Sequence, residues 1–185
     1  EAFFKRVLEI NKKNLGADHP EVARILNSLA MLYQDQGSYT DAEIFFTQAL
    51  GINEKSFGPN HPDVAVNLYN LAAVYHTQGR YNDAEPTLKR ALDIWKETLG
   101  LDHPKIASAL NNLSSLYHAQ GRYADAEPVL TQSLNITKKA FGPDHLKTST
   151  ALHNLGGLYT TQGRFAEAMP LYRQSLEIKK KYLPK

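Results

Sequence analysis

The chain has 185 residues, of which 42% are apolar, so it can bury the core of one ordinary domain or one repeat array. Its formal net charge is only +2, which argues against a dedicated binder of nucleic acid or another polyanion. Cysteine is absent, which excludes disulfides and thiolate metal sites and leads us to expect a reducing, cytoplasmic location.

The first stretch, EAFFKRVLEI, reads as part of a helix and carries no initial methionine, so we interpret the chain as a fragment of a longer protein. Residues 1–14 match residues 43–56, which predicts that they form the second helix of a truncated repeat. No apolar run approaches the ~20 residues of a membrane-spanning helix, and no signal peptide is visible.

A unit of 42 residues then repeats four times without gaps. The spacing is shown by Gly16, Gly58, Gly100 and Gly142, and by the tyrosines Tyr33, Tyr75, Tyr117 and Tyr159. Self-similarity at a fixed period is the signature of a repeat architecture. We therefore expect a single array with repeats at 15–56, 57–98, 99–140 and 141–185.

Each unit contains two helical patterns separated by a glycine. In the second repeat the first apolar stripe consists of Val64, Leu68, Leu71, Val74 and Tyr75, and the second of Tyr81, Ala84, Leu88, Ala91, Leu92 and Ile94. Between them, Gly79 is expected to adopt the left-handed conformation that ends a helix. The sequence thus predicts an all-α chain of nine helices: one leftover helix and four antiparallel pairs.

The stretch FGPNHPDV and its copies place a histidine at the start of every unit: His19, His61, His103 and His145. Metal ligands lie ~2 Å from a shared zinc, whereas equivalent residues of stacked helices are at least ~8–10 Å apart, so these histidines are expected to be structural. We expect Asn60 to cap its helix, or, one residue later, His61 to be the cap and Pro62 the first helical residue. Asp18 and Glu21 resemble a capping box.

Three further features are interpreted as structural. Alanines at 42, 84, 126 and 168 indicate the closest approach between helices. Lysines near the ends of the second helices, such as Lys55 and Lys139, oppose the helix dipole and are expected to face solvent. Trp95 stands where other repeats have Asn53, Thr137 and Lys179, and is expected to be partly exposed.

The order Leu-x2-Ala/Ser/Gly-x2-Tyr, followed by Gly-x-Tyr and Ala, resembles the tetratricopeptide repeat. The longer unit, with L/F-G-x-D/N-H-P and N-N-L-x-x-L-Y-x-x-Q-G-R-Y, closely resembles the repeats of kinesin light chains. The resemblance covers essentially the whole chain. It implies a right-handed superhelical solenoid of antiparallel helix pairs, whose first helices line a concave groove that grips an extended peptide.

The inward but uncommitted positions of the first helices are therefore the candidate peptide-binding residues. They are Arg24, Asn27, Met31, Val66, Tyr69, Asn70, Ala73, His76, Ser108, Asn111, Asn112, Ser115, His118, His153 and Asn154. Asparagine is a mediocre helix former, yet its amide offers both a donor and an acceptor. Asn70, Asn112 and Asn154 could form a ladder that pairs with a peptide backbone; alternatively, such asparagines tie adjacent helices together.

The charges of these positions limit the ligand. Tetratricopeptide domains that clamp a C-terminal carboxylate use lysines and arginines, but only Arg24 is cationic among the candidate residues. The same shortage argues against the tryptophan-acidic peptides that kinesin light chains bind. We expect a peptide held by backbone hydrogen bonds and one or two apolar side chains.

Enzyme signatures such as a phosphate-binding glycine loop, a nucleophile elbow or H-E-x-x-H are missing from the sequence. We therefore expect a noncatalytic protein–protein interaction scaffold without cofactor or metal, whose partner is a peptide segment rather than nucleic acid or membrane. Two alternatives stay open: a self-association or spacer module, and a sensor array that regulates an attached enzyme.

Overall fold

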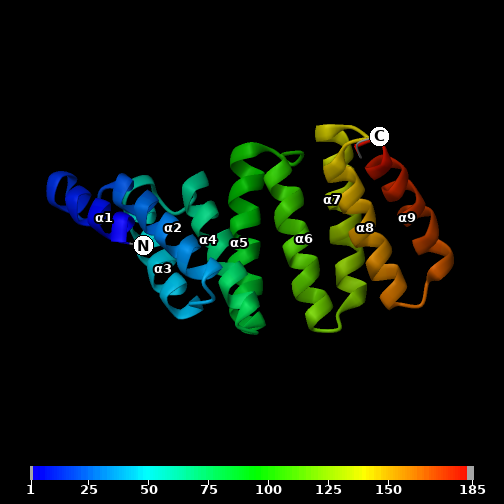
Figure 1. Cartoon of the computed structure of the whole chain (residues 1–185), viewed down its shortest axis with the longest axis horizontal. Coiled ribbons are helices and arrows are strands. Elements are labelled where there is room, and N and C mark those ends of the chain that lie inside the picture. Colours follow the sequence, from blue (N-terminus) through cyan, green and yellow to red (C-terminus); the bar gives the residue numbers. More distant parts are fainter. Residues whose placement is uncertain (1, 183–185) are drawn as a thin grey trace. The chain divides into compact units, whose positions relative to one another are not determined.

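The computed structural model describes residues 2–182, and within this range the chain forms nine α-helices and no strand (Figure 1). They are α1 (Ala2–Leu15), α2 (Pro20–Asp35), α3 (Tyr39–Phe57), α4 (Pro62–Thr77), α5 (Tyr81–Leu99), α6 (Pro104–Ala119), α7 (Tyr123–Phe141), α8 (Leu146–Thr161) and α9 (Phe165–Lys180). The expectation of an all-α array is confirmed. None of these helices is both long and apolar enough to cross a membrane.

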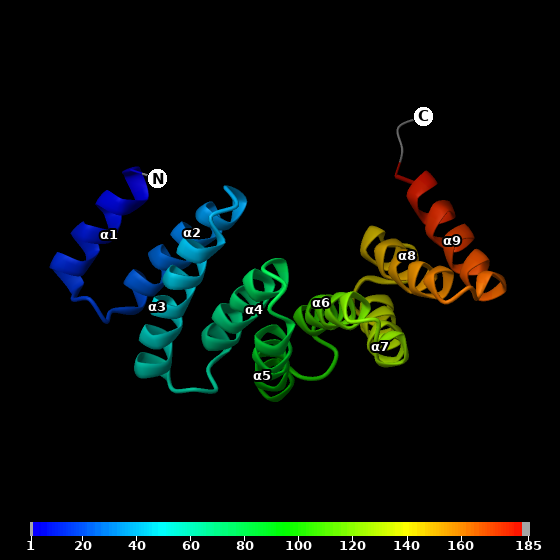
Figure 2. The ribbon, with the colours of Figure 1, turned by 90° about the horizontal axis from the view of Figure 1, so that it is seen from below.

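The helices fall into two compact units, one ending at Thr98 and the other starting at Leu99. In the first unit, α2 packs against α1 and α3, and α3 packs against α4. In the second unit, α7 lies between α6 and α8, α9 covers α8, and α6 also touches α8. Figure 2 shows α2 beside α3 in the first unit and α8 beside α9 in the second.

A glycine-centred turn joins the two helices of each pair, as predicted. Gly79 has a φ of 75°, which only a residue without a Cβ adopts at little cost. Its N–H donates to His76 O at 3.0 Å, and the N–H of Arg80 donates to Tyr75 O at 2.9 Å, the two bonds of a Schellman motif. Gly37, Gly121 and Gly163 repeat this geometry with φ values of 76°, 71° and 74°.

The first helix of each pair begins on a histidine, so the expectation that Asn60 is the cap is wrong and the alternative holds. His61 Nδ1 accepts a hydrogen bond from the Asp63 N–H at 3.2 Å, and Pro62 is the first helical residue. His19, His103 and His145 cap their helices in the same way. The imidazole of each histidine therefore accepts a hydrogen bond from a backbone N–H in the first turn of its own helix, which would otherwise have no partner.

The expected capping box of Asp18 and Glu21 does not form, because the Glu21 N–H donates to His19 Nδ1. The carboxylate of Asp18 pairs with Lys55, and its carbonyl accepts a hydrogen bond from Ser56 Oγ at 3.3 Å. Lys139 pairs with Asp102 in the same way, and Lys181 Nζ lies 2.9 Å from Asp144 Oδ1. These lysines are exposed, as expected, but each also forms an ion pair that links the end of its repeat to the start of the same repeat. The second repeat has Asn60 and Glu97 at the two positions.

The core of each unit lies between the paired helices. Ala42, Ala84 and Ala126 are completely buried and Ala168 nearly so, which agrees with their prediction as points of close helix contact. In the first unit, Phe46 of α3 lies between Ala30 of α2 and Leu71 and Val74 of α4.

Replacing Ala126 with Leu is expected to destabilise the second unit by about 1–3 kcal/mol, because a fully buried methyl position has no room for three more carbons. Urea unfolding followed by circular dichroism would measure the loss. Ala124→Leu, on the exposed side of the same helix, is the control. Equal stability of the two variants would show that position 126 is not tightly packed.

Candidate functional site

None of the fifteen candidate residues on the first helices is buried, so all of them keep some surface that a ligand could contact. The structure gathers most of them into two hollows, one in each unit. We call these the first-unit hollow and the second-unit hollow.

The first-unit hollow has a volume of about 430 Å³ and lies against α2, α3 and α4. Five candidate residues line it, together with six that were not in the candidate set. The candidates are Arg24, Asn27, Met31, Val66 and Asn70, and the others are Pro20, Glu21, Ser28, Asn53, Phe57 and Asp63.

A chain of three asparagines runs beside this hollow. Asn53 Nδ2 donates to Asn67 Oδ1 at 2.7 Å, and Asn67 Nδ2 donates to Asn27 Oδ1, also at 2.7 Å. Asn67 is completely buried, and the chain links α3, α4 and α2. Asn27 therefore ties helices together, which was the alternative explanation for the asparagines.

Asn67 was missed by the sequence analysis, although the repeat carries a signal for it. The equivalent positions hold Ile25, Ala109 and Ala151, all of them buried and apolar. A single asparagine at such a position indicates a buried polar partner, because an unpaired buried amide is costly.

The second-unit hollow has a volume of about 390 Å³ and brings together five candidate residues of α6 and α8. They are Asn111, Ser115, His118, His153 and Asn154, and the hollow is completed by Ser114, Leu130, Gly157, Leu158 and Thr161. His118 Nε2 lies 3.4 Å from Thr161 Oγ1, which joins the two helices at one end. No charged side chain lines this hollow among the described residues.

The predicted amide ladder is unengaged in the structure. The side chains of Asn70, Asn112 and Asn154 are half-buried and make no hydrogen bond to any residue within 2–182. Asn70 lies in the first-unit hollow and Asn154 in the second, whereas Asn112 lines neither. These amides keep both donors and acceptors available for a ligand.

Four other candidates lie outside the two hollows: Tyr69, Ala73, His76 and Ser108. The ring of Tyr69 packs on Trp95 with centroids 5.5 Å apart. Trp95 is only 2% exposed, so the expectation of partial exposure is wrong. The equivalent Asn53 and Thr137 are buried too, whereas Lys179 of the last repeat is exposed.

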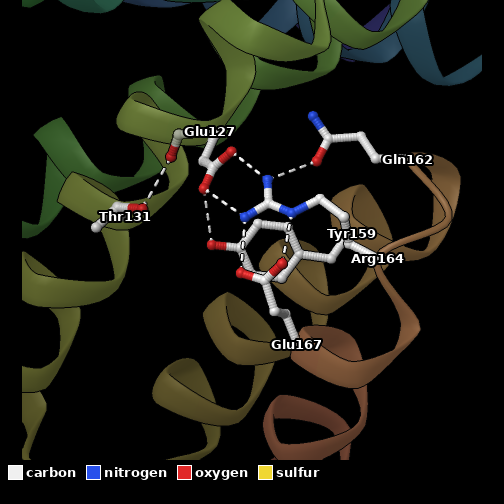
Figure 3. A network of polar contacts seen from close by, with 6 residues as sticks. All are labelled: Glu127, Thr131, Tyr159, Gln162, Arg164 and Glu167. Atoms are coloured by element: carbon white, nitrogen blue, oxygen red, sulfur yellow. Dashed lines mark hydrogen bonds and ion pairs between the residues drawn. The ribbon is translucent and has the colours of Figure 1, made fainter.

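A network of charges fastens α7, α8 and the turn before α9 in the second unit (Figure 3). Arg164 Nη1 lies 2.5 Å from Glu127 Oε2, and Arg164 Nε lies 2.8 Å from Glu167 Oε1. Tyr159 donates its hydroxyl to Glu127 Oε1 at 2.9 Å, while the guanidinium stacks over its ring at 4.1 Å. In the first unit, Arg80 joins Glu43, Asp83 and the ring of Tyr75 in the same way.

These contacts shift the acid–base equilibria of the groups involved. Hydrogen bonds from Arg164, and then from Tyr159, lower the pKa of Glu127 against the opposing effect of burial. Arg164 likewise lowers the pKa of Glu167, and burial followed by Glu127 raises the pKa of Tyr159. The two carboxyl groups are thus favoured in their charged form and the tyrosine in its neutral form. These are the forms that make the hydrogen bonds and ion pairs of the network, which indicates a structural role.

Acid should weaken this fastening. A carboxyl whose pKa is lower in the folded state contributes stability above its unfolded pKa, and this stability is lost as the pH falls through the folded pKa. We expect Glu127→Gln to lower the melting temperature at pH 7 and to reduce its further fall between about pH 5 and pH 3. Glu97→Gln, at an exposed carboxylate without an ion pair in the described chain, should leave both unchanged. Parallel melting curves for both variants would contradict the role of Glu127.

Comparisons with known proteins agree with the helix pairs and turns. The family model for the tetratricopeptide repeat matches residues 1–55, 21–97, 64–139 and 105–181, which together span nearly the whole chain. A comparison with curated proteins finds no match.

Solved structures with the same arrangement include repeat proteins of two organisms. A kinesin light chain-like protein of P. anserina with nearly identical TPR-like repeats is 26% identical, with a TM-score of 0.81 over 98% of this chain and 86% of that one. BtubC (BKLC) of P. vanneervenii shares the fold at 24% identity, with a TM-score of 0.88 over 100% of this chain and 74% of that one. Together with the family model, these findings show that the chain belongs to the tetratricopeptide repeat family.

Proposed function

We propose that this chain is a noncatalytic interaction module that binds an extended peptide segment of a partner protein on its first helices. Tetratricopeptide repeats generally mediate protein–protein interactions. The observation that carries the proposal is that the side-chain amides of Asn70, Asn112 and Asn154, at the same position of three repeats, are half-buried and make no hydrogen bond within residues 2–182.

The chemistry of these amides suits a peptide backbone. An extended peptide presents N–H and C=O groups in alternation, and a primary amide can pair with either. A helix surface that displays polar groups without partners keeps them hydrated, so a ligand with matched donors and acceptors can replace that water at little cost. The hollow beside Asn70 and the hollow beside Asn154 are each large enough to accept a side chain of a bound segment.

The test uses a peptide selected from a random 12-residue display library on the wild-type chain. Replacing Asn70, Asn112 and Asn154 together by Ala should weaken its binding by about tenfold or more, because each lost hydrogen bond contributes roughly 0.5–1.5 kcal/mol. Calorimetric titration measures the affinity, and circular dichroism checks the fold. The control is Asn82→Ala with Asn135→Ala, two exposed asparagines on second helices.

Affinity within about twofold of wild type, with the fold retained, would reject the assignment to the first helices. If the library yields no binder while the mass in sedimentation grows with protein concentration, the self-association alternative is favoured instead.

A further inference from the structure

The first-unit hollow exposes apolar side chains that the second-unit hollow lacks. Met31 of α2 is 55% exposed and Phe57, at the end of α3, is 42% exposed. The positions equivalent to Met31 hold the small residues Ala73, Ser115 and Gly157. Apolar surface of this kind at the edge of a hollow gains free energy when another apolar side chain covers it.

Two of the three asparagines that line the same hollow already take part in hydrogen bonds. Asn27 and Asn53 are both bonded to Asn67, and Ser28 Oγ donates to Arg24 O at 3.1 Å. Asn70 is the one lining amide that stays unengaged among the described residues. A ligand therefore meets apolar surface from Met31 and Phe57 together with one amide that can hold its backbone.

The charge of the hollow is negative. Arg24 Nε pairs with Glu21 Oε2 at 3.0 Å, which neutralises that carboxylate. Asp63 is 59% exposed, and its nearest basic atom, His61 Nδ1 at 3.7 Å, already accepts the Asp63 N–H. Asp63 pairs with no lysine or arginine among the described residues. The positions equivalent to Asp63 in the second unit hold Lys105 and Lys147, so the acidic edge belongs to the first unit.

We propose that the first-unit hollow binds a large apolar side chain of the partner segment, such as leucine, methionine or phenylalanine, with a lysine or arginine next to it in sequence. The apolar side chain packs on Met31 and Phe57, and Asn70 holds its backbone. Successive side chains of an extended chain point to opposite faces, so the neighbouring lysine or arginine uses its long, flexible stem to turn its cation toward the carboxylate of Asp63 at the edge. An acidic neighbour would instead meet a like charge. This inference rests on the proposed function and gives it a ligand class.

The two methionines of the chain provide a direct readout. Met31 lies in the first-unit hollow, and Met169 lies exposed on α9 of the other unit, outside both hollows. In protein carrying ¹³C-labelled methionine methyl groups, Met169→Leu assigns the two signals. The probes are three capped peptides, GSLKSG, GSLESG and GSSKSG, titrated at low salt.

We expect GSLKSG to shift the Met31 signal in a saturable manner and to leave the Met169 signal in place. Binding of GSLESG should be about fivefold weaker or more, because its charge is reversed, and GSSKSG should cause no saturable shift, because it has no apolar side chain. Asp63→Asn should bring the affinities for the first two peptides to within about twofold of each other. The control Asp35→Asn, at the exposed C-terminal end of α2, should preserve the preference.

Three results would overturn the inference: equal binding of GSLKSG and GSLESG to the wild type, an undiminished preference in Asp63→Asn, or equal shifts of both methionines. Peptides from the random library separate this failure from failure of the proposed function. If they lose affinity in the triple asparagine variant but carry no apolar-basic pair and leave Met31 unshifted, the function stands and the ligand class is wrong. If no library peptide binds, the proposed function fails, and the titration with GSLKSG still decides the chemistry of the hollow.

Discussion

Replacing Phe46 with Ala is expected to destabilise the first unit by about 3–5 kcal/mol, the usual cost of removing a buried aromatic ring. Phe46 is completely buried in α3 and is the largest of the fully buried side chains. It packs against Ala30 on one side and against Leu71 and Val74 on the other, so the cavity would open between three helices. Small neighbours such as Ala30 and Ala42 cannot move in to fill it.

Equilibrium unfolding in urea, followed by circular dichroism, measures this loss. Ile44→Ala is the matched control, because Ile44 lies two residues earlier on the same helix but is exposed. It should change stability by no more than about 0.5 kcal/mol. A loss below about 1 kcal/mol for Phe46→Ala would mean that the helices close around the missing ring, and that the packing of α3 is not fixed by it.

The second large effect is expected at Asn67. Its replacement by Ala should cost about 2–4 kcal/mol, because it leaves Asn53 Nδ2 and Asn27 Oδ1 without their partner, and each buried polar group left unpaired costs roughly 1–3 kcal/mol. The cost should fall when Asn53 is also replaced by Ala, because the double variant leaves fewer unpaired groups.

Asn70→Ala is the control for this experiment, since Asn70 lies on the same helix but makes no hydrogen bond within residues 2–182. It should leave stability nearly unchanged while it weakens peptide binding. Asn67→Ala should mainly lower the free energy of unfolding, in contrast to Asn70→Ala. If both variants lowered stability equally, the distinction between an asparagine that links helices and one that is available to a peptide would not hold.

Backbone rules explain why the helix pairs could be predicted so fully. The stripes in the second repeat follow the helical period, and Gly79 follows because a left-handed residue at a helix end needs the absence of a Cβ. The start of α4 was predicted only to within one residue. Asn60 and His61 are both capable caps, and the choice depends on the φ and ψ angles of the link, which the sequence alone does not determine.

The sequence predicts which positions of the first helices lie at the surface, but not the contacts that each of these residues makes. The helical period of the apolar residues defines the buried side of each first helix, and the candidate residues are the positions on the other side. Whether an asparagine is free for a ligand or links two helices depends on its hydrogen-bond partner on another helix. Asn27 accepts a hydrogen bond from Asn67, whereas Asn70 makes no hydrogen bond in the described chain. The exposure of Trp95 was wrongly predicted for the same reason, since its ring packs on Tyr69 of the other helix of the pair.

The pairing of Arg80 and Arg164 with glutamates was not predicted because each glutamate lies 37 residues before its arginine, in the preceding repeat. Nothing in the turns QGRY and QGRF indicates where Arg80 and Arg164 point until the helices are packed. The signal exists only as a paired recurrence, arginine at 80, 122 and 164 with glutamate at 43, 85 and 127.

That recurrence breaks at position 169, where methionine replaces the glutamate of the other second helices. This position matters to protein engineers who wish to lengthen the array. A grafted module copied from residues 57–98 would bring its own turn arginine to a thioether rather than a carboxylate, so the new junction would lack its ionic lock. Restoring glutamate at 169 is therefore the first edit for anyone who wishes to use this chain as an extensible building block.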